Sequence, residues 1–279
     1  MDSLPKRFFS RLSPLVEQGG AGGEHPEVPL LQVEALNVAF ASNTVLRNID
    51  FSVWRGESVA IIGESGCGKT VLLKTLIRLL IPTSGRVLFD GGDLASLSYI
   101  DLSQQQTRYG FVFQQAALFD SMTVGENIAF PLRQHSGKSE AEIREIVQRL
   151  LHEVGLTEQT ATKKPGELSG GMRKRVGFAR ALAMGPELML YDEPTTGLDP
   201  VMSGLINELM VNVRRQHNVS GIMVTHDLLS ARTVADRIIM LAPLAKLEAE
   251  EPQILFDGTP RDLYSSSDSR VRRFVRAAG

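Results

Sequence analysis

The residues from Gly63 to Thr70 read Gly-Glu-Ser-Gly-Cys-Gly-Lys-Thr, which are the types and the spacing of a polyphosphate-binding loop. The glycines let the backbone bend so that several N–H groups point at one anion, and the helix expected next directs its positive end there. Lys69 can reach the β- and γ-phosphates, and the Thr70 hydroxyl can bind Mg²⁺. A plain glycine-rich turn is the alternative, which the strand–loop–helix context disfavours. The predicted nucleotide contacts are Gly63, Glu64, Ser65, Gly66, Cys67, Gly68, Lys69 and Thr70.

Two apolar runs farther along the chain end in polar residues that can complete such a site. Asp192 and Glu193 follow the run 188–191, and His226 follows the run 221–225. A carboxylate at a strand tip can hold Mg²⁺ through water, and a second one can orient or deprotonate the attacking water. We therefore predict Asp192 as a metal ligand and Glu193 as the catalytic carboxylate. His226 is expected to contact the γ-phosphate, although alone it would suit an ordinary surface or core position.

A second anion site is predicted at the start of another helix. Ser169, Gly170 and Gly171 precede a run with three basic residues, and a serine followed by glycines at a helix start offers free N–H groups. Two phosphate-type sites far apart in one chain suggest that each nucleotide lies between one subunit's loop and its partner's Ser-Gly-Gly. We therefore expect a second copy of the chain as a partner.

The pattern of apolar residues indicates which elements position these groups. Strands are expected over 31–36, 46–53, 58–62, 84–90, 188–191 and 221–225, and helices over 71–80, 140–154, 170–183 and 201–216. Strand and helix patterns alternate, and a mostly helical segment interrupts them. We therefore expect an α/β fold with a parallel sheet and two lobes.

Composition narrows the function further. The net charge of −2 over 279 residues gives no general basic field, so nucleic acid is not an expected partner. Cys67 is the single cysteine, which excludes an intramolecular disulfide. No apolar stretch is long enough to cross a bilayer, and we identify no signal peptide. Residues 1–29 are expected to be a flexible extension, with a membrane-surface or partner-binding tail as the alternative.

With six motifs in order, the chain resembles the ATPase subunits of ATP-binding-cassette (ABC) transporters over about residues 30–260. The motifs are Walker A at 63–70, the Q-loop at Gln114, the signature at 168–172, Walker B at Asp192 and Glu193, the D-loop at 197–199 and the switch His226. The resemblance implies a P-loop NTPase (RecA-like) core, an antiparallel β subdomain and an inserted α-helical subdomain over about 115–183. It also implies an ATPase domain over 30–259 and a tail over 260–279 that contacts the neighbouring ATPase.

The same resemblance implies roles for individual residues. Phe40 would stack on adenine, with an ordinary core phenylalanine as the alternative. Gln114 would sense Mg²⁺ and water, and Lys69, Glu193 and His226 would act in catalysis. Ser169, Gly170 and Gly171 would contact the ATP held by the partner, and Asp199 would bridge the dimer. Met172 departs from the glutamine usual in the family, and we expect a modest effect on nucleotide contacts.

Four segments further resemble the ATPases of the MCE-associated lipid transporters, the Mla (maintenance of lipid asymmetry) group. They are 168–177, 113–124, 128–135 and 268–275. This resemblance implies a multi-span permease and an MCE-domain lipid-binding protein as partners, phospholipid or a related lipid as cargo, and a peripheral location on the cytoplasmic face of the bacterial inner membrane. The acidic turn 243–252 and the first thirty residues have no counterpart in it.

Two other classes stay open at this point. An importer of a small polar solute would use the same ATPase chemistry, because the ATPase chain does not touch cargo. A cassette protein of translation or DNA repair is disfavoured, because the chain has one set of motifs and no sustained heptad run.

Overall fold

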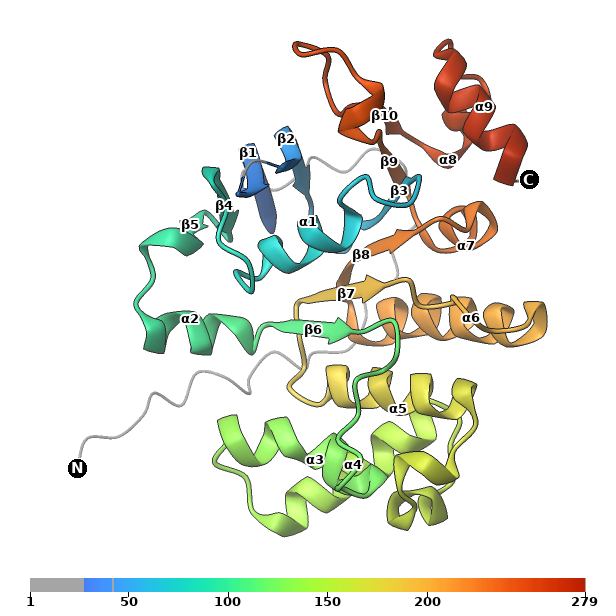
Figure 1. The fold of residues 1–279 in the computed structure, drawn as a ribbon. Coiled ribbons are helices and arrows are strands. Elements are labelled where there is room, and N and C mark those ends of the chain that lie inside the picture. The colour runs from blue at the N-terminus through green and yellow to red at the C-terminus, as the bar shows by residue number, and fades with distance from the viewer. Residues whose placement is uncertain (1–27, 42, 279) are drawn as a thin grey trace.

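The computed structural model describes residues 28–41 and 43–278 (Figure 1). The predicted extension 1–29 therefore lies almost entirely outside the described residues.

A six-stranded sheet in the order β10-β9-β3-β8-β7-β6 forms the centre of the molecule. All neighbours pair in parallel except β10, which is antiparallel to β9. The sequences of β3, β7 and β8 are short apolar runs, as expected for strands covered on both faces. The strands are β3 (Ser58–Gly63), β6 (Tyr109–Val112), β7 (Leu188–Asp192), β8 (Ser220–Thr225), β9 (Arg237–Leu241) and β10 (Ile254–Gly258).

A second sheet is antiparallel and has the order β2-β1-β4-β5. In β1, Leu31, Val33, Leu36 and Val38 are buried, with small breaks in the alternation where the strand is bulged. This sheet confirms the antiparallel β subdomain. Its strands are β1 (Leu31–Phe40), β2 (Asn43–Val53), β4 (Ser84–Phe89) and β5 (Gly92–Asp93).

The helices lie on both sides of the six-stranded sheet and beyond one of its edges. Helices α3 to α5 group together below the sheet in Figure 1, while α8 and α9 lie beside β10 at the opposite end. The helices are α1 (Lys69–Leu76), α2 (Tyr99–Gln106), α3 (Val124–His135), α4 (Glu140–Glu153), α5 (Gly170–Leu182), α6 (Pro200–His217), α7 (Leu228–Val234), α8 (Pro260–Tyr264) and α9 (Ser269–Ala278). Short 3₁₀ turns cover Leu94–Ser96, Glu158–Thr162, Pro165–Glu167 and Leu244–Lys246.

The two faces of the parallel sheet belong to two hydrophobic cores, because side chains alternate along a strand. Ala60 and Ile62 of β3 pack into the core with α3 to α7, whereas Val59 and Ile61 pack into the core with α1 and the antiparallel sheet. The arrangement confirms the α/β fold with a P-loop NTPase core. The predicted domain boundaries at 115, 183 and 259 stay a prediction.

One predicted helix is too long. The sequence pattern extends a helix over 71–80, but α1 ends at Leu76. Arg78 has φ = 57°, a left-handed conformation that a helix does not continue through. The apolar residues after Leu76 are therefore loop residues, and Leu79 and Ile81 are exposed.

The acidic turn 243–252, which could not be interpreted from the sequence, packs on β2 and on the loop before α1. The Arg47 guanidinium donates to the carbonyl oxygens of Glu248 and Glu251 at 2.8 and 2.7 Å. Lys246 pairs with the Glu64 carboxylate. Charged side chains therefore connect the turn to β2 and to the loop before α1.

Within residues 28–41 and 43–278, no helix combines the length and the apolar character needed to span a membrane.

Candidate active site

The loop between β3 and α1 needs its glycines for two physical reasons. Gly63, Gly66 and Gly68 have φ values of 150°, 82° and 97°, which residues with a Cβ rarely adopt. A Cβ at Gly63 would also collide with the carbonyl oxygen of Leu241, and one at Gly68 would lie 2.7 Å from the Leu46 side chain. The loop thus packs closely against β9 and β2.

Lys69 begins α1 and turns its side chain back over the loop. Its ammonium donates to the carbonyl oxygen of Gly63 at 2.8 Å and to that of Glu64 at 3.3 Å. The side chain is 8% exposed, and its Nζ lies 4.0 Å from Glu193 Oε1. A mostly buried cation is therefore held above the loop, where a bound phosphate can accept from it.

Thr70 and Asp192 meet although 122 positions separate them. The Thr70 hydroxyl donates to Asp192 Oδ1 at 2.9 Å, and Asp192 is 5% exposed at the end of β7. Burial raises the pKa of Asp192, and the hydrogen bond from Thr70 opposes this shift. A cation bound between the two oxygens would favour the ionised carboxylate.

Glu193 and His226 come together at the ends of neighbouring strands. His226 Nδ1 lies 2.9 Å from Glu193 Oε2, and the Thr196 hydroxyl donates to the same oxygen at 3.0 Å. His226 is 59% exposed, whereas Glu193 is only 13% exposed. The mostly buried carboxylate is thus oriented by the Thr196 hydroxyl and by the exposed His226 ring.

Contacts thus join Lys69, Thr70, Asp192, Glu193 and His226 at the carboxyl ends of β3, β7 and β8. The phosphate loop joins this group through the contacts of Lys69 to Gly63 and Glu64. The other predicted site residues lie outside the group; they are Phe40, Gln114, Ser169, Gly170, Gly171 and Asp199. Gln114 is exposed just after β6, and Phe40 is 48% exposed at the end of β1. Ser169 and Asp199 are N-caps, accepting from the backbone N–H groups of Met172 at 3.2 Å and Met202 at 3.0 Å.

The predicted second anion site lies at the first turn of α5. Gly170 has no atom within 4 Å of where a Cβ would stand, whereas Gly171 is buried against the Met202 side chain. The exposed serine and Gly170 therefore face outward, where another molecule can reach them. Within one chain, the first turn of α5 is capped by the Ser169 side chain.

Cys67 is 1% exposed, and burial raises the pKa of its thiol. Its carbonyl oxygen accepts from Gln253 at 3.1 Å. The predicted contribution of Cys67 to nucleotide binding would therefore come from its backbone, because its side chain is turned into the protein.

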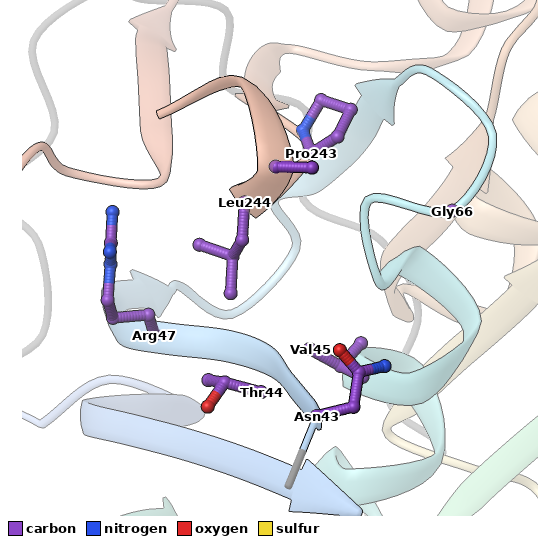
Figure 2. A pocket seen from close by; sticks show the side chains of 8 residues that line it. Asn43, Thr44, Val45, Arg47, Gly66, Pro243 and Leu244 are labelled. Atoms are coloured by element: carbon purple, nitrogen blue, oxygen red, sulfur yellow. The ribbon is translucent and has the colours of Figure 1, made fainter. Parts of the chain in front are cut away.

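Sequence reasoning did not connect Thr196 or the acidic turn 243–252 with the candidate site. An open pocket of about 460 Å³ lies beside the phosphate loop, between β2 and this turn (Figure 2). Figure 2 shows Asn43, Val45 and Leu244 around it, with Gly66 of the loop at its side. No local pattern predicts this pocket, since the turn between β9 and β10 is far from β2 and the phosphate loop in the sequence. Thr196 could have been found from its place three residues after Glu193.

Comparison with known proteins agrees with this geometry. Residues 46–196 match the family model described as "ABC transporter". The "Probable ribonucleotide transport ATP-binding protein mkl" of Mycobacterium leprae is 40% identical over 256 residues, covering 92% of this chain and 71% of that protein. The "Intermembrane phospholipid transport system ATP-binding protein MlaF" of Haemophilus influenzae is 37% identical over 247 residues, covering 88% of this chain and 90% of that protein.

Among solved structures, the ATP-binding cassette MJ0796, in a dimeric post-hydrolysis state bound to ADP and Pi, superposes with a TM-score of 0.73. It is 30% identical, and the match covers 83% of this chain and 99% of that one. The fold and the site thus define a P-loop ATPase. The chain belongs to the ABC transporter family, as its ATP-binding subunit.

Proposed function

We propose that Glu193 is the catalytic carboxylate of this ATPase. Glu193 would accept a proton from water, whose oxygen attacks the γ-phosphorus of ATP. The bond to the β–γ bridging oxygen breaks, and ADP and phosphate leave. Lys69 and His226 would hold the negative charge that spreads over the γ-phosphoryl oxygens. The contact of 2.9 Å between His226 and Glu193 is the observation that carries this proposal.

The oxygen donors at Thr70 and Asp192 suit Mg²⁺. A hydroxyl and a carboxylate are hard ligands, and Mg²⁺ usually takes only one or two protein oxygens besides water and phosphate. The two oxygens lie 2.9 Å apart at the base of the phosphate loop. Thr70 and Asp192 would hold the ion, with Gln114 contacting it through water, and the ion would neutralise charge on the β- and γ-phosphates.

We infer that the nucleoside part of bound ATP extends from the phosphate loop toward the pocket of Figure 2. Phe40 pairs with Asn43 across the β1–β2 hairpin, and Asn43 lines that pocket. The half-exposed aromatic ring of Phe40 is suited to stack on adenine.

The active form is proposed to be a dimer that closes around two ATP molecules. Ser169, Gly170, Gly171 and Asp199 have no role within one chain beyond capping and packing, and they would complete the partner's site. The dimeric state of the MJ0796 cassette supports this arrangement. ATP would bring two copies together, and hydrolysis would release them.

The proposed cargo is phospholipid or a related lipid, moved by a permease with an MCE-type partner. The MlaF relative is named for intermembrane phospholipid transport, and nearly its full length is matched. The Met172 signature and the segment 268–275 support the same assignment. On this proposal the chain would be bound to its permease on the cytoplasmic face of a bacterial inner membrane.

A small polar solute is the second candidate. The mkl relative is named for ribonucleotide transport and is slightly more similar in sequence. Affinity purification of the tagged chain from detergent-solubilised membranes, with mass spectrometry of bound proteins and lipids, distinguishes the two. An MCE-domain protein and copurified phospholipid would support lipid transport. A solute-binding protein with a different permease would overturn it and leave the ATPase chemistry intact.

A further inference from the structure

A buried lysine beside the site has no place in the chemistry described so far. Lys174 lies on the second turn of α5 and is 6% exposed. Its ammonium donates to the carbonyl oxygens of Pro194 at 2.6 Å and Thr196 at 2.8 Å, and the carbonyl oxygen of Glu193 is 3.5 Å away. The partners that the structure gives this cation are therefore carbonyl oxygens of one turn.

That turn carries the catalytic carboxylate in an unfavourable conformation. Glu193 has φ = 47°, in the left-handed region that residues with a Cβ rarely adopt. Its N–H donates to Val224 at 2.9 Å, and the Thr196 N–H donates back to Glu193 at 3.2 Å. Such a conformation persists only where its surroundings hold it, and carbonyl dipoles that converge on one point repel each other without a cation.

Lys174 supplies that cation from a different part of the chain. Its helix, α5, is capped by Ser169. The turn that Lys174 holds continues through Leu198 to Asp199, the N-cap of α6. One ammonium thus ties the Ser-Gly-Gly helix start to the segment from Glu193 to Asp199. We expect a change in the position of α5 to move this segment, because two of the contacts are only 2.6 and 2.8 Å long.

We propose that Lys174 is a positioning residue for Glu193, which fixes the turn 193–196 so that the carboxylate faces the γ-phosphate. Through the same contacts Lys174 links the state of the Ser-Gly-Gly helix to the carboxylate. This inference rests on the proposed role of Glu193. It predicts that Lys174 affects the chemical step rather than nucleotide binding.

The test compares Lys174→Met, which keeps the length of the side chain and removes its donors, with Lys174→Arg, which keeps donors. Lys174→Met should lower kcat for ATP about 10- to 100-fold and leave KM within about twofold, and Lys174→Arg should recover part of the loss. Arg175→Met is the matched control. Arg175 is the next residue of the helix and donates to the carbonyl of Gly155 at 2.9 Å, away from the catalytic turn, so its kcat should match the wild type.

A double-mutant cycle separates positioning from a merely structural role. In a Glu193→Gln background, Lys174→Met should change the residual turnover by less than about twofold, because the carboxylate that Lys174 positions is already absent. Wild-type kcat in folded Lys174→Met, or additive losses in the double variant, would overturn the inference. Should Lys174→Met fail to fold, Lys174→Gln takes its place in the same cycle.

The outcome also separates this inference from the proposal on which it rests. Normal turnover in Glu193→Gln would overturn the proposed catalytic role itself. An inactive Glu193→Gln combined with a fully active Lys174→Met would overturn only the role of Lys174. Both measurements use the full-length chain with its copurified permease.

Discussion

The side-chain amide of Gln253 donates to the carbonyl oxygen of Cys67 at 3.1 Å, although 186 positions separate the two residues. The same amide group also lies within hydrogen-bond distance of the carbonyl oxygens of Val45 and Ala242, at 3.1 and 3.2 Å. The side-chain oxygen Oε1 of Gln253 accepts from the backbone N–H of Arg47 at 2.8 Å. A single buried glutamine thus ties the phosphate loop to β2 and to the turn before β10.

Removing this glutamine should destabilise the loop between β3 and α1. Gln253→Leu leaves the Arg47 N–H and three carbonyl oxygens without this partner in a fully buried position. We expect a loss of about 2–4 kcal/mol in the free energy of unfolding, measured by urea denaturation. Gln159→Leu, at an exposed position, should change it by less than about 0.5 kcal/mol. Equal losses in the two variants would contradict this account of Gln253.

Glu193→Gln should separate ATP binding from hydrolysis. The amide keeps the shape of the side chain but cannot accept a proton from water, so turnover should fall about 10²- to 10⁴-fold. ATP should still bind and should promote dimer formation, measured by nucleotide binding and light scattering. Glu145→Gln, an exposed residue of α4, should keep wild-type turnover. Normal hydrolysis by Glu193→Gln would exclude Glu193 as the catalytic carboxylate.

Thr196→Val should weaken catalysis with little effect on folding. It removes the hydroxyl that donates to Glu193 Oε2 at 3.0 Å. A hydrogen bond to a charged group contributes about 1.5–3 kcal/mol, so we expect kcat to fall roughly 10- to 100-fold. Thr162→Val is the control, since its hydroxyl donates to the Gln159 carbonyl on the surface, far from β7 in sequence. Comparable kcat values in both variants would show that Thr196 does not orient the carboxylate.

The stability of the wild type relative to Lys174→Met should rise with pH above about 8. Burial lowers the pKa of Lys174 from 10.5 to about 8, and the charge of Glu193 opposes the shift. Between these two values the unfolded chain binds more protons at this lysine than the folded chain does. The free energy of unfolding therefore increases with pH there, by at most about 1 kcal/mol per pH unit, and is flat below about 7. Urea denaturation from pH 7 to 10 measures the difference, and parallel curves for the two proteins would refute the prediction.

Much of the fold could be predicted because its signals are local. The buried strands β3, β7 and β8 are short apolar runs, and the helices α4 and α6 show clear periodicity. Helix α1 was predicted too long because hydrophobicity continues beyond the residue where the backbone turns left-handed. The turn 243–252 could not be interpreted, because its partners Arg47 and Glu64 lie far away in the sequence.

The sequence by itself determined the chemistry, since the loop 63–70 and the acids after β7 carry their function in residue types and local spacing. Only the tertiary structure decided which atoms meet. The strands lie in the order β9-β3-β8-β7, so their carboxyl ends bring Thr70 to Asp192 and His226 to Glu193 at one edge. The hydrogen bonds of Lys174 and Gln253 to the segments around the site could not be predicted from the sequence either. The carbonyl oxygens that accept from these two side chains come together only in the folded chain.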